Sequence, residues 1–200
     1  HVIVIGGGDT GADCVGTANR QGAASVTNLA IGRKPGLVRT ESQPWPVHPT
    51  LFEVTSSHEE GGERRYLAST VEFLGDAQGH VHGLRVAETG ITERGREPIP
   101  GTERVLEADL VLIAMGFSGP EHIDDAWFPL GRSARGAFAR ERDYSTELPG
   151  VFVAGDAGRG QSLIVWAIAE GRAAAAAVDA YLTGSTVLPS PVLATDHAFA

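Results

Sequence analysis

Apolar runs and one helical period divide the first part of the chain into elements. Residues 2–5 are wholly apolar, as in a strand buried on both faces, and a glycine-rich turn follows them. The pattern then predicts a helix over about 10–21, which Gly22 ends as a left-handed C′ residue. A second strand is expected over 25–31. Together these elements predict a βαβ unit.

The middle of the chain changes from loops to strands. Residues 34–65 are rich in Pro, Gly, Ser and Glu and show little periodicity, which predicts loops and short helical turns. Two short runs, 71–74 and 81–86, flank a Gly-Asp-Ala-Gln-Gly turn and predict an antiparallel hairpin. A strand near 103–107 is expected to continue this hairpin into a meander.

The last third of the chain combines apolar strands, irregular segments and a long helix. Residues 109–114, which are apolar after Asp109, predict a strand that leads into a crossing of small residues. We expect another short strand over about 148–154 and a long helix over 162–182. The remaining residues, 185–200, are expected to be a frayed tail.

This order of elements predicts an α/β fold with two parts. Because the glycine-rich turn of residues 6–11 joins the first strand to the first helix, residues 1–116 are expected to form a Rossmann-type NAD(P)H-binding domain with an inserted antiparallel meander. Because an apolar stretch stops at Gly155 and Asp156 before the long helix, residues 117–184 are expected to form the C-terminal part of an FAD-binding domain, as in flavoproteins with two dinucleotide-binding domains. The long helix should then expose apolar surface where the rest of that domain would pack.

Composition and charge narrow the class of protein. The 200 residues are 42% hydrophobic and 20% charged, as in ordinary globular proteins, and the net charge of −9 argues against nucleic acid and anionic membranes as partners. No apolar run approaches the roughly 18 residues that a membrane span needs. These features favour the cytoplasm. The first strand directly follows His1, so we expect the natural start to lie upstream.

Two features that invite a chemical role have simpler interpretations. Cys14 is the single cysteine, which excludes an internal disulfide, a C-x-x-C redox pair and an iron–sulfur cluster held by this stretch alone. Its place in the first helix predicts a small packed residue. The His and the two acids of residues 57–60 are consecutive, so they cannot share a helical face. We expect a loop that closes over a nucleotide there, and no metal site.

Residues 6–11 carry the pattern G-x-G-x-x-G between a strand and a helix. In that context the pattern indicates a dinucleotide-binding site. Gly6 permits the tight turn, Gly8 lets the backbone approach a pyrophosphate, and Gly11 lets the helix pack closely on the strand. A glycine-rich turn without a ligand is the alternative.

The end of the second strand indicates which nicotinamide coenzyme is bound. Enzymes that use NAD carry Asp or Glu there, as the acceptor for the ribose 2′-hydroxyl. This chain has Arg33 and Lys34 instead. Two cations suit the 2′-phosphate of NADPH, through charge-assisted hydrogen bonds worth about 1.5–3 kcal/mol each. A solvated basic turn is the alternative.

A second ligand site is predicted where an apolar strand stops at Gly155 and Asp156. The Asp156 carboxylate can accept hydrogen bonds from the ribityl hydroxyls of FAD. The backbone around Gln161 and Ser162 would lie near the flavin N1–C2=O edge, where a helix N-terminus stabilises negative charge. Asp156 as an ordinary turn or N-cap residue is the alternative.

With these motifs assembled, the chain resembles the small (β) subunits of bacterial NADPH-dependent glutamate synthase, a family within the pyridine nucleotide-disulfide oxidoreductase-like flavoproteins. Residues 4–17, 56–62, 114–117 and 160–172 carry the resemblance. The last segment, Gly-Gln-Ser-Leu-Ile-Val-Trp-Ala-Ile-Ala-Glu-Gly-Arg, is far more specific than a general FAD motif. The N-terminal half of dihydropyrimidine dehydrogenase and other NADPH-dependent reductase subunits are close relatives of this family.

The resemblance implies an enzyme that takes a hydride from NADPH onto FAD. Electrons would then pass through iron–sulfur clusters to a glutamate synthase large subunit, which makes glutamate from glutamine and 2-oxoglutarate. The 4Fe–4S clusters and the first FAD βαβ unit are expected upstream of these residues. Hydride transfer from nicotinamide to flavin needs no protein acid or base, so no catalytic side chain is assigned.

The resemblance also implies roles for particular residues. Those expected to hold the NADPH pyrophosphate are Gly6, Gly8, Asp9, Thr10 and Gly11. Those expected to face the 2′-phosphate are Arg33 and Lys34. Those expected to line FAD are Gly155, Asp156, Gln161 and Ser162.

Two other functions fit the same motifs. A noncatalytic module that senses NADPH would keep the first glycine turn and lose its flavin function. A related NADPH:FAD reductase subunit would pass its electrons to another acceptor. An upstream cysteine cluster with a second G-x-G-x-x-G pattern would favour the glutamate synthase subunit over the noncatalytic module. A thioredoxin-reductase-like enzyme is excluded because its C-x-x-C pair is missing.

Overall fold

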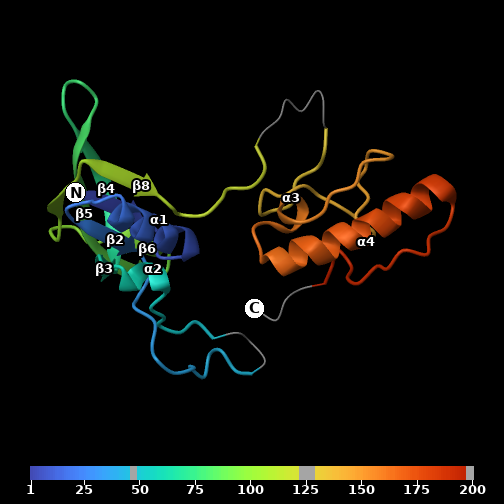
Figure 1. Cartoon of the computed structure of the whole chain (residues 1–200), viewed down its shortest axis with the longest axis horizontal. Helices are drawn as coiled ribbons and strands as arrows, with labels where there is room; N and C mark the ends of the chain where they lie inside the picture. Colours follow the sequence, from blue (N-terminus) through green and yellow to red (C-terminus); the bar gives the residue numbers. More distant parts are fainter. Residues whose placement is uncertain (46–48, 122–128, 197–200) are drawn as a thin grey trace. The chain divides into compact units, whose positions relative to one another are not determined.

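A computed structural model of the chain describes residues 1–45, 49–121 and 129–196 (Figure 1). The chain forms two compact units, His1–Gly116 and Phe117–Ala200. The assignment of the first unit to NAD(P)H and of the second to FAD stays a prediction.

The first unit is built on a parallel sheet. Its strands are β1 (Val2–Ile5), β2 (Val26–Ala30), β3 (Glu63–Tyr66) and β8 (Leu110–Ile113), in the spatial order β3-β2-β1-β8 (Figure 1). Helix α1 (Asp9–Arg20) connects β1 to β2, and every neighbouring pair in the sheet is parallel. The predicted βαβ unit and the strand over 109–114 are therefore confirmed.

The loop prediction for residues 34–65 is only partly correct. A short helix, α2 (Ser56–Glu59), agrees with the expected helical turns, but β3 was not expected. The β3 sequence, Glu-Arg-Arg-Tyr, has neither an apolar run nor an alternating pattern. Its strand conformation comes from pairing with β2, which is a tertiary effect that local propensity does not report.

An antiparallel sheet forms the rest of the first unit. Strand β5 (Val81–Thr92) pairs with β4 (Ala68–Gly75), β6 (Gly95–Pro98) and β7 (Arg104–Glu107). The predicted hairpin and its third strand are confirmed. The second strand, however, runs on to Thr92, and β6 was missed because its Gly-Arg-Glu-Pro sequence is polar and contains a proline.

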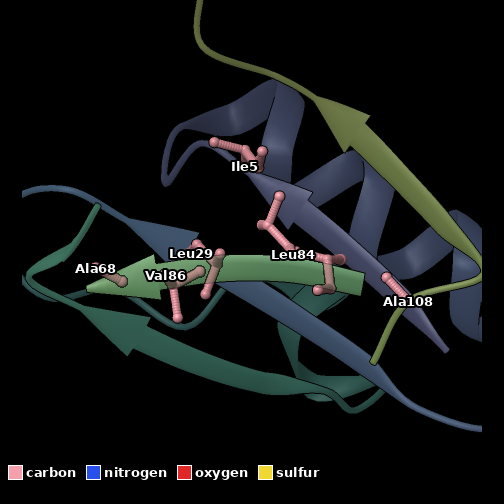
Figure 2. Packing of buried hydrophobic residues seen from close by; sticks show 7 residues of the cluster. Ile5, Leu29, Ala68, Leu84, Val86 and Ala108 are labelled. Atoms are coloured by element: carbon pink, nitrogen blue, oxygen red, sulfur yellow. The ribbon is translucent and has the colours of Figure 1, made fainter. Parts of the chain in front are cut away.

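Alternation along β1 places a separate core on each face of the parallel sheet. Residues Ile3 and Ile5 point to the antiparallel sheet, whereas Val4 points to α1. Figure 2 shows the first core, in which side chains from both sheets meet: Ile3, Ile5, Leu29, Ala68, Leu84, Val86 and Ala108. Full burial of each large apolar side chain contributes about 1.5–3 kcal/mol. The parallel sheet thus lies between α1 and the meander, and Cys14 packs on the α1 side as predicted.

The described residues of the second unit form two helices and little regular strand. Helix α3 (Asp156–Arg159) is followed by α4 (Ile164–Thr183), which confirms the predicted long helix. The expected strand over 148–154 is wrong, because its only strand-like pairing among the described residues is an isolated bridge between Phe152 and Ser145. No helix in the described ranges is long and apolar enough to cross a membrane.

The tail prediction also needs correction. Tyr144 is buried against Ala173 and Ala174 of α4, and the tail residue Val192 packs on the same cluster. The Tyr144 hydroxyl donates to the Val192 carbonyl oxygen at 2.9 Å. Residues 192–194 of the tail therefore pack on the second unit, whereas residues 185–191 are exposed.

The start of α4 exposes apolar side chains, as predicted. Ile164, Val165 and Ile168 are 75%, 61% and 58% exposed. Among the described residues they form an apolar face at the N-terminal end of the helix.

Candidate dinucleotide-binding sites

The turn between β1 and α1 has two positions where steric contacts require glycine. Gly6 has φ +133°, and a Cβ there would lie 2.0 Å from the Ala114 carbonyl oxygen. A Cβ on Gly11 would lie 2.1 Å from the Gly6 carbonyl oxygen. Both contacts are with backbone atoms, so a side chain would force the turn, α1 or β8 to move.

Gly8, in contrast, faces open space. Nothing lies within 4 Å of the position that its Cβ would take. Gly8 is the N-cap of α1, and no side chain caps the helix there. The next two residues, Asp9 and Thr10, are exposed. The first N–H groups of a helix have no acceptor inside it, so this turn offers donors and a positive dipole end to an anion.

Asn28 supports the turn from β2 and was not singled out from the sequence. Its Nδ2 donates to the Gly6 carbonyl oxygen at 2.7 Å and to the Val4 carbonyl oxygen at 3.3 Å. The side chain is only 3% exposed. A polar residue in the middle of an otherwise buried strand was the available signal, since a buried amide needs partners.

Asn28→Asp is expected to destabilise the first unit by about 1–3 kcal/mol at neutral pH, because an ionised carboxylate cannot donate to the two carbonyl oxygens. Burial beside those oxygens should raise the pKa of the new carboxyl above its ordinary value. A raised pKa means that the loss of stability is small at low pH, where the protonated acid can donate a hydrogen bond, and that this loss grows as pH rises. Urea unfolding at several pH values measures this, and Gln78→Glu is the exposed, charge-matched control. A deficit independent of pH would contradict the donor role.

Arg33 and Lys34 lie just beyond the carboxyl end of β2. Because β1 and β2 are parallel, this end shares an edge of the sheet with the glycine turn. Both side chains are exposed, and neither forms an ion pair within the described ranges. The Lys34 ammonium lies 4.2 Å from the centroid of the Phe52 ring, and the Arg64 guanidinium also stacks on that ring at 4.5 Å.

The segment around His58 does not close over the glycine turn. Helix α2 packs on the C-terminal half of α1, where Ser57 approaches Gly16 and Glu60 pairs with Arg20. Burial, and then the charge of Arg64, hold the pKa of His58 below its ordinary value. Across the described residues, no group of three or more His, Cys, Asp or Glu is placed to hold a metal.

The second unit contains a cavity of about 520 Å³ that Asp156 and Gln161 both line. Phe117, Arg135 and Arg159 line it too. The structure therefore brings two of the four residues predicted for FAD into one hollow. Asp156 is the first residue of α3, a helix that the sequence did not predict.

The other two predicted FAD residues are placed differently. Ser162 is exposed and is not among the residues that line the cavity. Gly155 lies directly before Asp156 in a left-handed conformation, φ +62°, and its N–H donates to Glu170 Oε2 at 2.8 Å. The backbone at the predicted Gly-Asp position is therefore held by a side chain of α4.

Glu170 is the centre of an ionic cluster, which sequence reasoning missed. Its side chain is 0% exposed, and it accepts hydrogen bonds from Arg140 at 2.7 and 2.9 Å and from Arg159 Nε at 2.6 Å. Burial alone would raise the pKa of Glu170, but the hydrogen bonds from Arg140, the Gly155 N–H and Arg159 together outweigh it and lower the pKa. The available signal was a carboxylate in the middle of an apolar, alanine-rich stretch of the chain.

The first unit has a Rossmann-type βαβ unit with an open glycine turn, and the second has a cavity lined by Asp156. This combination is typical of dinucleotide-binding α/β proteins. The sequence model for pyridine nucleotide-disulphide oxidoreductases matches residues 1–171. The chain belongs to this family.

Comparison with known proteins agrees with this assignment and confirms the resemblance noted from the sequence. The chain is 53% identical to the glutamate synthase (NADPH) small chain of Mycobacterium tuberculosis, across 97% of this chain and 40% of that protein. It is 42% identical to the glutamate synthase (NADH) of Saccharomyces cerevisiae, across 94% of this chain and 10% of that protein. The thioredoxin reductase of T. acidophilum shares the fold, with a TM-score of 0.62 and 21% identity over 92% of this chain and 52% of that one.

Proposed function

We propose that this chain is part of an NADPH-dependent flavin oxidoreductase that supplies electrons to a glutamate synthase large subunit. The large subunit would use them to make glutamate from glutamine and 2-oxoglutarate. The open glycine turn at the start of α1 is the observation that carries the nicotinamide site. Membership of an oxidoreductase family and the similarity to glutamate synthase small chains support the reaction.

The first unit would bind NADPH at the carboxyl edge of its parallel sheet. The N–H groups at the start of α1 would donate to the pyrophosphate, where the missing side chain of Gly8 leaves room. The residues that we assign to this contact are Gly6, Gly8, Asp9, Thr10 and Gly11. Arg33 and Lys34 would pair with the 2′-phosphate through charge-assisted hydrogen bonds.

The second unit would hold part of FAD in the cavity beside α3. The volume of this cavity, about 520 Å³, lies in the range of small-molecule sites, and Asp156 and Gln161 line it. Asp156 would accept from ribityl hydroxyls, and Gly155, Gln161 and Ser162 would supply backbone contacts. Bound FAD supplies the acceptor for the hydride of NADPH. The role of the protein is to orient the two rings and exclude water, without an acid or base of its own.

The remaining parts of the electron path would lie outside these residues. A 4Fe–4S cluster held by cysteines needs about four of them, and this chain has only Cys14. We therefore assign the clusters to another part of the protein and the final electron acceptor to the large subunit. A cytoplasmic enzyme would suit this reaction.

Titration of the chain with NADPH and with NADH tests the nicotinamide site. We expect micromolar binding of NADPH, and at least about tenfold weaker binding of NADH, because one charge-assisted phosphate contact is worth about 1.5–3 kcal/mol. The double variant Arg33→Ala/Lys34→Ala should weaken NADPH binding, and so reduce this preference, and leave NADH binding unchanged. Calorimetry gives the affinities.

The matched control for charge removal is Arg94→Ala/Arg104→Ala, which takes two exposed cations from the same unit. It should keep the preference for NADPH. Equal affinity of the unmodified chain for the two coenzymes would contradict the 2′-phosphate assignment. A folded chain that binds neither coenzyme would contradict the nicotinamide site itself.

A further inference from the structure

Two backbone hydrogen bonds through Leu67 connect the hairpin of β5 and β6 to the carboxyl end of β2. The Leu67 N–H donates to the Gly32 carbonyl oxygen at 2.9 Å, and the Thr89 N–H donates to the Leu67 carbonyl oxygen at 2.8 Å. Leu67, which takes part in both hydrogen bonds, has a positive φ of +51°. The buried Ser69 and Thr89 hydroxyls add a hydrogen bond of 2.7 Å beside it. The inserted meander is therefore positioned against the predicted coenzyme end of the sheet.

Arg96 extends from this hairpin to the segment that follows β2. It lies on β6, where it pairs with Ile91 of β5. Its Nη2 and Cζ atoms lie 3.8 and 3.9 Å from the position that a Cβ would take on Gly32. Gly32 immediately precedes Arg33 and Lys34, so Arg96 approaches the backbone next to two further cationic residues at the end of one strand.

The guanidinium of Arg96 is available for a ligand. Its side chain is exposed, and within the described ranges it forms neither an ion pair nor a side-chain hydrogen bond. The chain as a whole carries a net charge of −9, so a cluster of cations without carboxylate partners is a local exception. Such a cluster attracts an anion. Glycine at position 32 leaves the space beside the guanidinium open.

We propose that Arg96 is a specificity-determining residue for the coenzyme and binds the 2′-phosphate together with Arg33 and Lys34. This inference rests on the proposed NADPH-binding function. A guanidinium presents a rigid planar fork that pairs with a phosphate through two hydrogen bonds, whereas Lys34 is a single flexible charge. The inserted meander thus adds a phosphate-binding group to the βαβ unit, and sequence order does not reveal it.

The test compares the affinities of NADPH and NADH for the chain and its Arg96 variants by calorimetry. Arg96→Ala should weaken NADPH binding about tenfold, in keeping with the loss of one charge-assisted contact, and leave NADH binding unchanged. Arg96→Lys keeps the charge but not the fork, so it should restore only part of the affinity. Competition by 2′,5′-ADP against 5′-ADP should show the same selective loss, because these two ligands differ only in the 2′-phosphate.

Arg94→Ala is the matched control. Arg94 is an exposed arginine at the turn of the same hairpin, and its substitution should leave both affinities unchanged. An Arg96→Ala variant that binds NADPH normally, or that loses NADPH and NADH equally, would overturn the role of Arg96. Because the unmodified chain would still prefer NADPH in that case, the proposed function would stand. An unmodified chain that binds both coenzymes without a preference for NADPH would overturn the role of Arg96 together with the 2′-phosphate assignment, and a folded chain that binds neither would overturn the proposed function.

Discussion

Glu170→Gln is expected to lower the free energy of unfolding of the second unit by about 3–5 kcal/mol, because it leaves two buried guanidinium groups without a counter-charge. The side chains of Arg140 and Arg159 are only 6% and 12% exposed, so water cannot replace the lost carboxylate. Glutamine has nearly the same shape, so the loss reports charge and hydrogen bonding rather than a cavity. The total stability of a domain is about 5–15 kcal/mol, which makes this a large effect.

Amide hydrogen exchange read by mass spectrometry localises the effect of Glu170→Gln. Exchange should become faster in the segments joined at Glu170, which are residues 137–144, α3 and α4. The first unit should be unaffected. Glu141→Gln is the control, since Glu141 is an exposed carboxylate beside one of the two arginines in sequence. Equal exchange in the two variants would show that the cluster does not stabilise the second unit.

The pH dependence of unfolding provides a further check on the Glu170 cluster. The pKa of Glu170 is lower in the folded chain than in the unfolded chain. Its contribution to the free energy of unfolding is therefore complete above the ordinary glutamate pKa of about 4.3, and it is lost as pH falls through the lower pKa of the folded chain. The stability gap between the natural chain and Glu170→Gln should therefore be constant near neutral pH and shrink below about pH 4. A gap that stays constant down to pH 3 would contradict a carboxylate role.

Gly11→Ala is expected to weaken NADPH binding about 100-fold or more and to destabilise the first unit by about 1–3 kcal/mol. The added Cβ would lie 2.1 Å from the Gly6 carbonyl oxygen and 3.4 Å from Asn28 Nδ2, so the turn must move. A displaced turn loses two or more charge-assisted contacts with the pyrophosphate, each worth about 1.5–3 kcal/mol. Calorimetric titration with NADPH and urea unfolding give the two quantities.

Gly8→Ala separates the two effects. Its Cβ would meet nothing within 4 Å, and its φ of −95° suits any residue, so stability should fall by at most about 1 kcal/mol. The methyl group would still occupy the space assigned to the pyrophosphate, and NADPH binding should weaken strongly. If Gly8→Ala binds NADPH normally, the coenzyme does not approach this turn.

The strands that the sequence predicts are those whose apolar side chains form the core. The sequence predicts β1 and β8 from their apolar runs, and it predicts the turn between β1 and α1 from its glycines. Both predictions depend only on neighbouring residues. Strands β3 and β6 were missed for the opposite reason. Their sequences are polar, and they become strands because a neighbour offers backbone hydrogen bonds.

The supporting residues of the sites could not be assigned from the sequence because their partners lie far away along the chain. Asn28 supports a turn on another strand, and Glu170 is paired with arginines from two different segments. Each was visible only as a polar residue in an apolar context. The glycine turn is predictable because steric limits act locally, whereas the pairing of buried charges depends on the completed fold.

The hydrogen bonds that join Gly32, Leu67 and Thr89 have a consequence for how coenzyme preference can evolve. Backbone hydrogen bonds and the buried Ser69 and Thr89 hydroxyls hold the base of the β5–β6 hairpin, and none of these groups lies at its tip. If the tip supplies Arg96 to the coenzyme, substitutions there can change the preference for NADPH or NADH while the glycine turn and the core stay the same. The β5–β6 hairpin could then be exchanged between family members that use different nicotinamide coenzymes.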